Sequence, residues 1–546
     1  MSLRLHPGQP LPPDVDLFLN LTVLPSPPIR PSEFQPTGNG IKAIYEILNA
    51  EGSSLESSVL QWTDAQDRLE RYRRTYFQTF HIKWPILHAP TFGIQSAPLQ
   101  LAASVCLLGS WFMNPTGDER SYALKVHDIL LQRLLTSLMN QELITEGQGW
   151  PGEHFQAVLL TLIFSLYRTD AIVLSKATHL RNVFITTLRD LGAFNDKSLG
   201  AHLEAYYSGS YAPYALSMRE RFKRLSALTY QFDTYFALAR KIPPLMHHQE
   251  ISIPLPSTFM VWNTYGLDIL PIRQREEPPE RSLVAVSTMI SRRNSQRPLQ
   301  FLVEDVQLGL CGLLQAIWAF TQPFTTNIEA DYGNAAQRAM LTKKLDIWKH
   351  ELDTINGFAD LKNIQSDKAR YLYLAYRGEN NFIAPSLERM SALVQDTMIL
   401  YYFLRLLHYA GLNAPSETTE LGPAENSNLG SSQEIKDDRE ALVCALQLLA
   451  MAETSGASSQ LPSFNPLTYH ALRLGMHVVQ VVLSKQVCDC AASDGQQQAT
   501  TNDLRQWAEN GGRAPWINES PICVCTFERC TERFQNAIRD RKPLLE

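Results

Sequence analysis

Apolar residues recur along most of the chain at spacings of three and four, which is the period of an amphipathic α-helix. In the first such segment, which begins near residue 59, the apolar face is formed by Leu69, Tyr72, Tyr76 and Phe80. Further helices are expected at 97–113, 121–139, 154–168, 174–191, 217–241, 301–320, 335–353, 386–410, 436–455, 465–487 and 524–541. Neither alternating strand patterns with hairpin turns nor a repeat of fixed period occurs. The pattern predicts an all-α fold, a large irregular multi-helix bundle with long loops.

Three proline-rich or polar stretches divide this helical pattern. Residues 1–40 are rich in proline and are expected to form an extended, poorly ordered arm, in which the apolar run 16–24 packs loosely or docks on a partner. Residues 271–299 mix charge, proline and serine and predict a linker or long loop, and residues 412–435 predict a polar loop. The remaining parts are then a first half at 59–270, a second half at 300–411 and a C-terminal helical region at 436–546.

The composition is that of a folded protein with a sizeable core, because 45% of the 546 residues are hydrophobic and 19% are charged. The formal net charge of -6 argues against nucleic-acid binding by the whole surface, although one small basic patch would be compatible with it. The most apolar stretches, 99–113 and 155–167, are shorter than the roughly 20 residues that cross a bilayer. They are expected to be buried helices, so no membrane partner is predicted.

Sequence motifs of catalysis are missing. The chain has no phosphate-binding GxxxxGK[ST] loop, no GxGxxG after a strand, no GxSxG elbow and no HExxH helix. No pair of carboxylates is singled out by spacing or by an apolar setting. The sequence therefore predicts no catalytic and no cofactor-binding residue, and the chain is not expected to be an enzyme.

The cysteines near the C-terminus are weak candidates for a metal site. They are Cys488, Cys490, Cys523, Cys525 and Cys530. A single residue separates the members of each close pair, whereas tetrahedral zinc favours two or more residues between thiolates. Eight scattered cysteines in a chain of this length favour thiols in a reducing compartment over a zinc site.

One stretch, YFQTFHIKWPILHAPTF at 76–92, resembles the opening signature of the fungal-specific transcription factor domain. The matching residues are Phe80, His81, Pro85, Leu87, His88, Pro90, Thr91 and Phe92. Pro85 is expected to end the preceding helix, because the residue before a proline disfavours the α conformation. For His88 we expect a buried hydrogen bond in preference to a bound metal.

The stretch 221–262 is similar to the central part of the same family. Its matching residues are Lys223, Arg224, Leu225, Phe232, Asp233, Pro243, Pro244, Glu250, Pro254, Leu255, Pro256 and Trp262. Residues 174–194 resemble the helix that ends in Arg-x-Leu-Gly-x-Phe in that family, and residues 399–412 resemble its hydrophobic helix with Leu-His near the end. A tryptophan that often precedes the basic pair is absent.

The resemblance covers roughly residues 60–410 and implies a nuclear regulator of RNA polymerase II transcription, acting on a metabolic pathway or a biosynthetic gene cluster. It also implies DNA binding through zinc, but no cofactor is evident in this chain and no zinc module with its ligands is seen. A truncated product, a mispredicted start or a regulator that acts through partners would each explain this. The implied partners are DNA and the transcription machinery or coregulators, and a homodimer and a small-molecule effector are plausible.

Two alternatives remain open at the level of sequence. One is a helical interaction scaffold or corepressor without DNA contact. The other is an all-α biosynthetic enzyme, which is disfavoured because an acidic metal-binding motif of the DDxxD kind does not occur.

Overall fold

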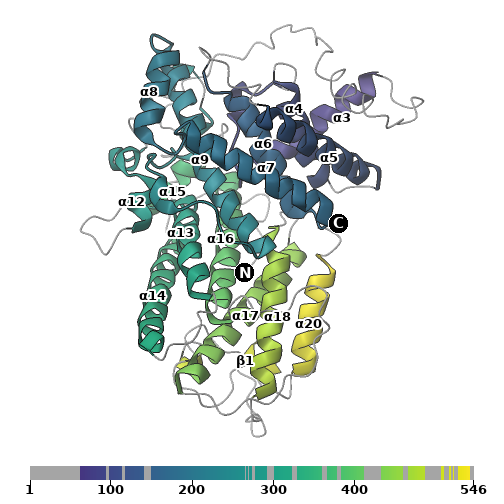
Figure 1. Ribbon diagram of the computed structural model, residues 1–546, viewed down its shortest axis with the longest axis vertical. Coiled ribbons are helices and arrows are strands. Elements are labelled where there is room, and N and C mark those ends of the chain that lie inside the picture. The colour runs from purple at the N-terminus through teal and green to yellow at the C-terminus, as the bar shows by residue number, and fades with distance from the viewer. Residues whose placement is uncertain are drawn as a thin grey trace, which may run out of the picture.

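The computed structural model describes residues 62–93, 97–113, 117–140, 149–264, 266–268, 270–272, 277–291, 300–321, 329–358, 366–377, 383–410, 432–458, 465–485, 506–508, 516–517, 520–521 and 527–541. Helices make up nearly all of these segments, which confirms the predicted all-α class (Figure 1). The exception is a two-residue antiparallel pair, β1 (Trp516–Ile517) with β2 (Ser520–Pro521).

The first group of helices occupies the upper part of the view in Figure 1. It consists of α3 (Trp62–Thr75), α4 (Leu99–Phe112), α5 (Gly117–Met139), α6 (Gly152–Phe164), α7 (Ala171–Asp190), α8 (Asp196–Tyr207) and α9 (Ala212–Arg240). The short helices α10 (Phe259–Trp262) and α12 (Val286–Ser291) follow.

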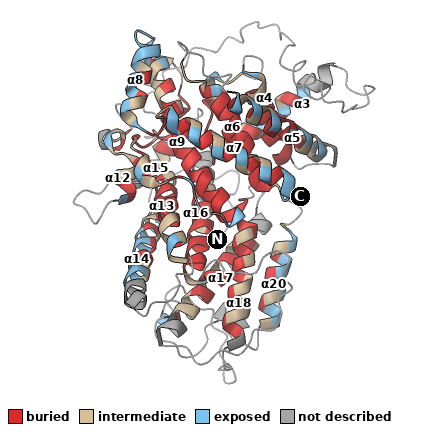
Figure 2. Ribbon diagram, viewed as in Figure 1, coloured by how far each residue is buried: buried red, intermediate tan, exposed pale blue. Residues whose placement is uncertain are grey.

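The second group extends downward from the first. It consists of α13 (Val303–Thr321), α14 (Glu329–Phe358), α15 (Asp367–Tyr376), α16 (Ile383–Ala410), α17 (Ser432–Ser458), α18 (Leu467–Lys485) and α20 (Phe527–Arg539). The long helix α9 joins the groups, because it packs against α6 and α8 on one side and against α13 and α18 on the other. Figure 2 shows that its middle is buried.

The ends of the helices are explained by local chemistry. The side chain of Asp170 accepts hydrogen bonds from two backbone N–H groups at the start of α7, and Asn195 does the same for α8. Lys241 closes α9 in the left-handed conformation with φ of 52°, which turns the chain sharply back over the bundle. The extended segment that follows this turn therefore lies beside α9.

The periodicity located the long helices to within a few residues, and the predicted apolar face of α3 is buried at Leu69, Tyr72, Tyr76 and Phe80. The helical backbone ends earlier than expected: a π-helical turn, η1 (Tyr76–Phe80), is followed by a turn at 81–83, before Pro85. The sequence did not indicate α8, α10, α12 or α15, which are short.

The predicted division of the chain stays a prediction. Residues 1–40 and nearly all of 412–435 lie outside the described residues. Within the expected linker 271–299, the described part contains the 3₁₀ turn η6 (Pro279–Leu283) and α12. Glu277 and Arg281 there are buried, so this part of the stretch is packed into the domain.

Packing between α3 and α4 leads to a first prediction. A Cβ atom at Gly109 of α4 would lie 1.9 Å from the backbone oxygen of Tyr72 in α3, so Gly109→Ala forces the helices apart. Overpacking of this kind costs on the order of 1–3 kcal/mol, because backbone must move. The urea midpoint of the variant should fall.

Gly200→Ala is the matched control, because no atom lies within 4 Å of the new Cβ in α8. It should gain about 0.5–1 kcal/mol from helix propensity. Equal midpoints for the two variants would contradict the close approach.

Candidate functional site

An extended segment, residues 251–258, lies at the centre of the candidate site. One edge of it is paired: Leu255 N donates to Val284 O at 2.9 Å, and Val286 N donates to Ile253 O at 3.0 Å. Pro254 and Pro256 supply no N–H groups, so this segment cannot enter a regular sheet on both edges. The carbonyls of Leu255, Pro256 and Ser257 take their hydrogen-bond donors from side chains instead.

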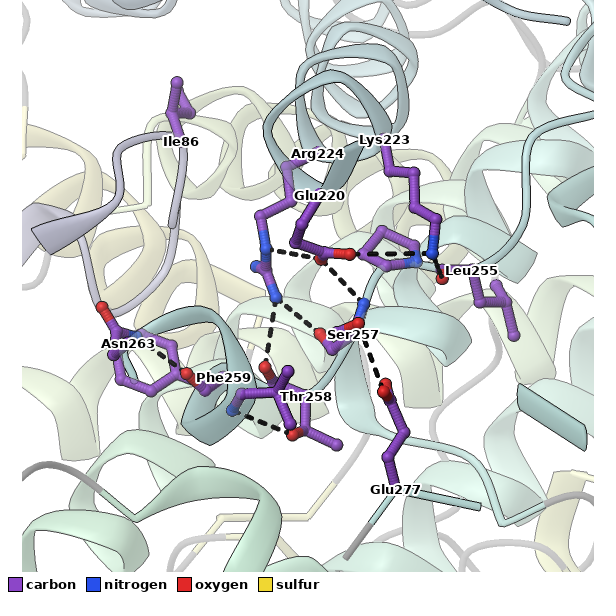
Figure 3. A network of polar contacts seen from close by, with 12 residues as sticks. Ile86, Glu220, Lys223, Arg224, Leu255, Ser257, Thr258, Phe259, Asn263 and Glu277 are labelled. Atoms are coloured by element: carbon purple, nitrogen blue, oxygen red, sulfur yellow. Dashed lines mark hydrogen bonds and ion pairs between the residues drawn. The ribbon is translucent and has the colours of Figure 1, made fainter. Parts of the chain in front are cut away.

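Three cationic side chains supply those donors, one for each successive carbonyl (Figure 3 labels two of them). The pairs are Lys223 Nζ to Leu255 O at 3.3 Å, Arg281 Nε to Pro256 O at 3.1 Å and Arg224 Nη2 to Ser257 O at 2.5 Å. Charge-assisted hydrogen bonds of this type are stronger than neutral ones. The basic pair on α9 therefore holds the proline segment in place.

Each cation is also matched by a buried carboxylate. Glu220 lies one turn before Arg224 on α9 and approaches its Nε at 2.9 Å and Lys223 Nζ at 3.7 Å. The same Glu220 accepts a hydrogen bond from Ser257 N at 2.8 Å. Arg281 forms a two-point ion pair with Asp305 of α13. We call these five side chains, Glu220, Lys223, Arg224, Arg281 and Asp305, the carbonyl clamp.

Trp262 joins the clamp to the first sequence motif. The guanidinium of Arg224 lies 5.2 Å from the centroid of the Trp262 ring, and the ring of His88 lies 4.9 Å from it. His88 Nε2 faces the carbonyl of Thr264 at 3.3 Å and must donate, so Nδ1 accepts from the hydroxyl of Thr91 at 2.7 Å. Burial lowers the pKa of His88 to about 4, which keeps the ring neutral. The expected buried hydrogen bond of His88 is present.

His81 makes a second bridge to the same short helix. Its Nε2 lies 3.3 Å from Asn263 Oδ1, and the amide of Asn263 is oriented by donation from Nδ2 to Phe259 O at 2.8 Å. Burial lowers the pKa of His81 to about 3, so this histidine is also neutral. The two motifs, which are 131 positions apart from Phe92 to Lys223, therefore meet around α10.

Asp233 and Glu250 of the second motif anchor the turn after α9. Arg181 Nε of α7 donates to Asp233 at 2.7 Å, and the other oxygen of Asp233 accepts from the backbone N–H groups of Leu245 and Met246 at 2.9 Å each. Arg189 Nε donates to Glu250 at 2.8 Å. These contacts place the turn that contains Pro243 and Pro244 against α7.

The other predicted motif residues serve packing. Phe80, Pro85, Leu225 and Pro254 are buried, whereas Pro90, Phe92, Pro244 and Pro256 are partly buried and Pro243 is exposed. The sequence reasoning missed Arg181, Arg281 and Asp305, which lie outside the residues matched to the motifs. A charged residue inside an otherwise apolar helix face was the available signal for Arg181.

The fourth resemblance, 399–412, falls on the last turns of α16 as far as Ala410, and an ion pair that was not predicted joins an earlier turn of this helix to the first motif. Lys83 Nζ, within the first motif, donates to Asp396 of α16 at 2.9 Å, and both side chains are buried. Near the end of α16, His408 Nε2 contacts the hydroxyl of Thr342 in α14 at 3.2 Å. The first motif thus contacts both groups of helices.

Two small cavities lie beside these contacts. One, of about 10 Å³, is lined in part by Lys223, Ser257 and Trp262, and the other, of about 20 Å³, in part by Lys83 and Asp396. A single water molecule needs roughly 10–15 Å³ by the same measure, so each holds about one water and neither holds a metabolite.

Within the described residues, no three or more His, Cys, Asp and Glu side chains are grouped to hold a metal ion. Of the weak zinc candidates, Cys530 is buried in α20, and Cys488, Cys490, Cys523 and Cys525 lie outside the described residues. The described residues thus do not fit a zinc site. None of the described helices has the length and apolar character that a membrane span requires.

The chain belongs to the family described as the fungal specific transcription factor domain, whose model matches residues 74–350. This match confirms the family resemblance. It also confirms that the chain is not an enzyme, because the family consists of transcription factor domains.

Two curated relatives, both from Schizosaccharomyces pombe, are similar to this chain. Zinc finger protein zas1 is 25% identical over 45% of this chain and 27% of its own length. Zinc finger protein klf1 is 19% identical over 51% of this chain and 35% of its own length. The chain thus matches about a quarter to a third of the length of these relatives. No solved structure matches it.

The clamp yields a second prediction. Arg224→Met should lower the free energy of unfolding by about 3 kcal/mol or more, because Glu220 is left buried without its closest cation. Urea unfolding followed by circular dichroism measures this. The control is Arg219→Met on the same helix, whose ion pair with Asp196 is about 40% exposed on each side. It should cost less than about 1 kcal/mol. A loss at Arg224 no larger than at Arg219 would refute the clamp.

The buried histidines yield a third prediction, on pH. The folded pKa of His88, about 4, lies below its unfolded value of about 6.5, so the unfolded chain binds the proton more readily. The contribution of neutral His88 is therefore complete above pH 6.5 and is lost as the pH falls toward 4. The slope is about 1.4 kcal/mol per pH unit within that window. His88→Gln should flatten the measured dependence of unfolding free energy on pH, whereas His179→Gln, at an exposed site on α7, should leave it unchanged.

Proposed function

We propose that this chain acts in the nucleus as the regulatory region of a transcription factor that controls RNA polymerase II transcription. The family match over residues 74–350 carries this proposal. The names of the two relatives, both zinc finger proteins, support a further part of it: DNA is contacted through zinc, in a module distinct from the helical domain. A metabolic pathway or biosynthetic gene cluster is the proposed target, as the resemblance implies.

The geometry of the clamp supports assigning DNA contact to another module. Lys223 and Arg224 look like a basic patch in the sequence, but both are buried and bound to carbonyls and to Glu220. Phosphate binding needs exposed cations that can displace the counterions condensed on DNA. The role proposed for the helical domain is therefore to receive and transmit regulatory contacts. Coregulators, the transcription machinery and a second copy of the chain are the proposed partners.

A small-molecule effector would need more room than either cavity beside the motif residues provides. Binding of an effector would therefore require the Lys83–Asp396 contact, or the surface next to Trp262, to open. Both places lie where the first and second motifs meet the rest of the domain, so a change there would reach α10 and α16.

The second candidate is an interaction scaffold or corepressor without DNA contact. The net charge of -6 favours it, because a protein that binds DNA by itself usually presents a basic surface. The two candidates differ in whether the gene product occupies DNA through zinc.

A tethering experiment is the fourth prediction. The full chain fused to an unrelated DNA-binding domain should change transcript levels of a reporter that carries the matching site, relative to that domain alone. The same fusion with Arg224→Met should lose most of the effect because the clamp is broken, and Arg219→Met should keep it. Reporter RNA is measured, with fusion levels checked by immunoblot. A fusion that is inert at equal abundance would count against a regulatory role.

Chromatin immunoprecipitation of the product of the native locus separates the two candidates. Recovery of specific promoter DNA that is lost on zinc chelation supports contact through a zinc module. Recovery that is insensitive to chelation and lost when a partner protein is depleted supports the scaffold.

A further inference from the structure

The corner between α8 and α9 exposes an unusual number of aromatic side chains. Tyr206, Tyr211 and Tyr214 are 44%, 57% and 50% exposed, and Tyr207, the neighbour of Tyr206 in the chain, is partly buried. We call these four side chains the tyrosine patch. Figure 1 shows α8 at one end of the molecule, and Figure 2 shows exposed residues along it. Clustered exposed aromatic side chains mark interaction surfaces, because folding alone gains nothing from leaving them in water.

The rings of the patch are held in place from below. His202 stacks on Trp150 with ring centroids 4.0 Å apart, and the backbone N–H of Trp150 donates to His202 Nε2 at 3.3 Å. Tyr206 packs 4.9 Å from His202, and Tyr207 lies 6.1 Å from Tyr214. A surface built in this way is already ordered before anything binds, so binding loses little side-chain entropy.

Acidic side chains border the patch. Glu204 is exposed on the last turns of α8, three residues before Tyr207, and the side chain of Glu153 is 46% exposed. Burial raises the pKa of Tyr207 most, and the charge of Glu153 adds to this rise. Arg221 forms an ion pair with Glu153 at 3.7 Å. The patch therefore combines aromatic rings with negative charge.

Proline-rich peptides are the ligands that such a surface fits. Polyproline II helices repeat every three residues and dock prolines against aromatic rings, while a neighbouring basic residue pairs with an acid. The segment Pro-Ser-Pro-Pro-Ile-Arg-Pro at 25–31 of this chain places Pro25, Pro28 and Pro31 on one side of such a helix. Arg30 supplies the positive charge.

We propose that residues 25–31 of the same chain dock on the tyrosine patch, with the prolines against the tyrosine rings and Arg30 at Glu204 or Glu153. The docked arm covers one end of α9, and this proposal is independent of whether the protein contacts DNA. Residues 32–61 connect the segment to the start of α3. Thirty residues span roughly 30 Å as a flexible chain and up to about 100 Å when extended, so the segment is not confined to the start of α3.

The fifth prediction is competition between the arm and a free peptide. A fluorescent peptide of residues 23–33 is titrated into the full chain, and into the full chain with Pro25→Ala, Pro28→Ala and Pro31→Ala. An attached segment has an effective concentration of about 1 mM, so for an intrinsic Kd of about 100 μM it weakens peptide binding about tenfold. The triple variant, whose arm is disabled, should bind the peptide about tenfold more tightly than the unchanged chain.

Variants of the patch locate the site. Tyr206→Ala with Tyr214→Ala, introduced into the triple variant, should abolish peptide binding, whereas the same positions changed to Phe should retain it because the rings remain. Leu283→Ala, at an apolar residue that is 82% exposed elsewhere, should have no effect. Melting temperatures of all variants confirm that they are folded.

The remaining outcomes overturn the proposal. Equal peptide affinity for the unchanged chain and the triple variant would mean that the patch takes a proline-rich segment from another molecule. Binding that survives loss of both tyrosines would place the peptide elsewhere. An affinity gain that depends on protein concentration would mean that the arm docks on a second copy of the chain.

Discussion

The fold depends on one constraint: three consecutive carbonyls, those of Leu255, Pro256 and Ser257, lie in a largely buried segment whose prolines prevent regular pairing. A buried carbonyl without a donor costs free energy comparable to a lost hydrogen bond, so the segment can lie there only if donors are brought to it. Lys223 and Arg224 come from α9, and Arg281 comes from the turn η6. This requirement fixes α9, η6 and the proline segment relative to one another.

Burying the cations creates a second requirement, which draws in more of the chain. A charge without a partner in the interior is strongly unfavourable, and so Glu220 and Asp305 must be buried with them. Asp305 lies at the start of α13, and the clamp therefore binds the second group of helices to the first. His88 and His81 attach the first motif to the same place as neutral hydrogen-bonding groups. Burial is the main cause of their lowered pKa values, and the nearby cations lower these values further.

The sequence predicted the elements better than it predicted their pairing. The apolar spacing indicated the long helices but not α8 and α15, which have 12 and 10 residues. The motif residues His88, Asp233 and Trp262 all proved to be at the centre of contacts. Their partners could not be read from the sequence, because Lys83 and Asp396 are 313 positions apart, and Arg181 and Asp233 are 52 apart. Periodicity reports which face of a helix is buried but not which charge on another helix will meet it. The packing of part of 271–299 into the domain was not predicted for the same reason. The composition of this stretch is typical of a loop, and the contacts of Arg281 with Pro256 and Asp305 could not be read from it.

The placement of charge bears on how such a domain can be regulated. The basic pair of α9, Lys223 and Arg224, binds internal carbonyls and is not exposed to a partner. A regulatory partner must therefore contact the domain at other, exposed residues. One helix connects the two places that matter most: α9 begins at the tyrosine patch and carries Glu220, Lys223 and Arg224 within the next turns. Tyr214 and Glu220 are six residues apart, about 9 Å along the helix axis. An occupant of the patch that shifts the first turns of α9 therefore acts directly on the clamp, and through Asp305 on α13. Because the clamp pairs buried charges, a small displacement of its side chains has a large energetic cost. A contact at the surface of α8 and α9 can therefore affect the stability of the centre of the domain.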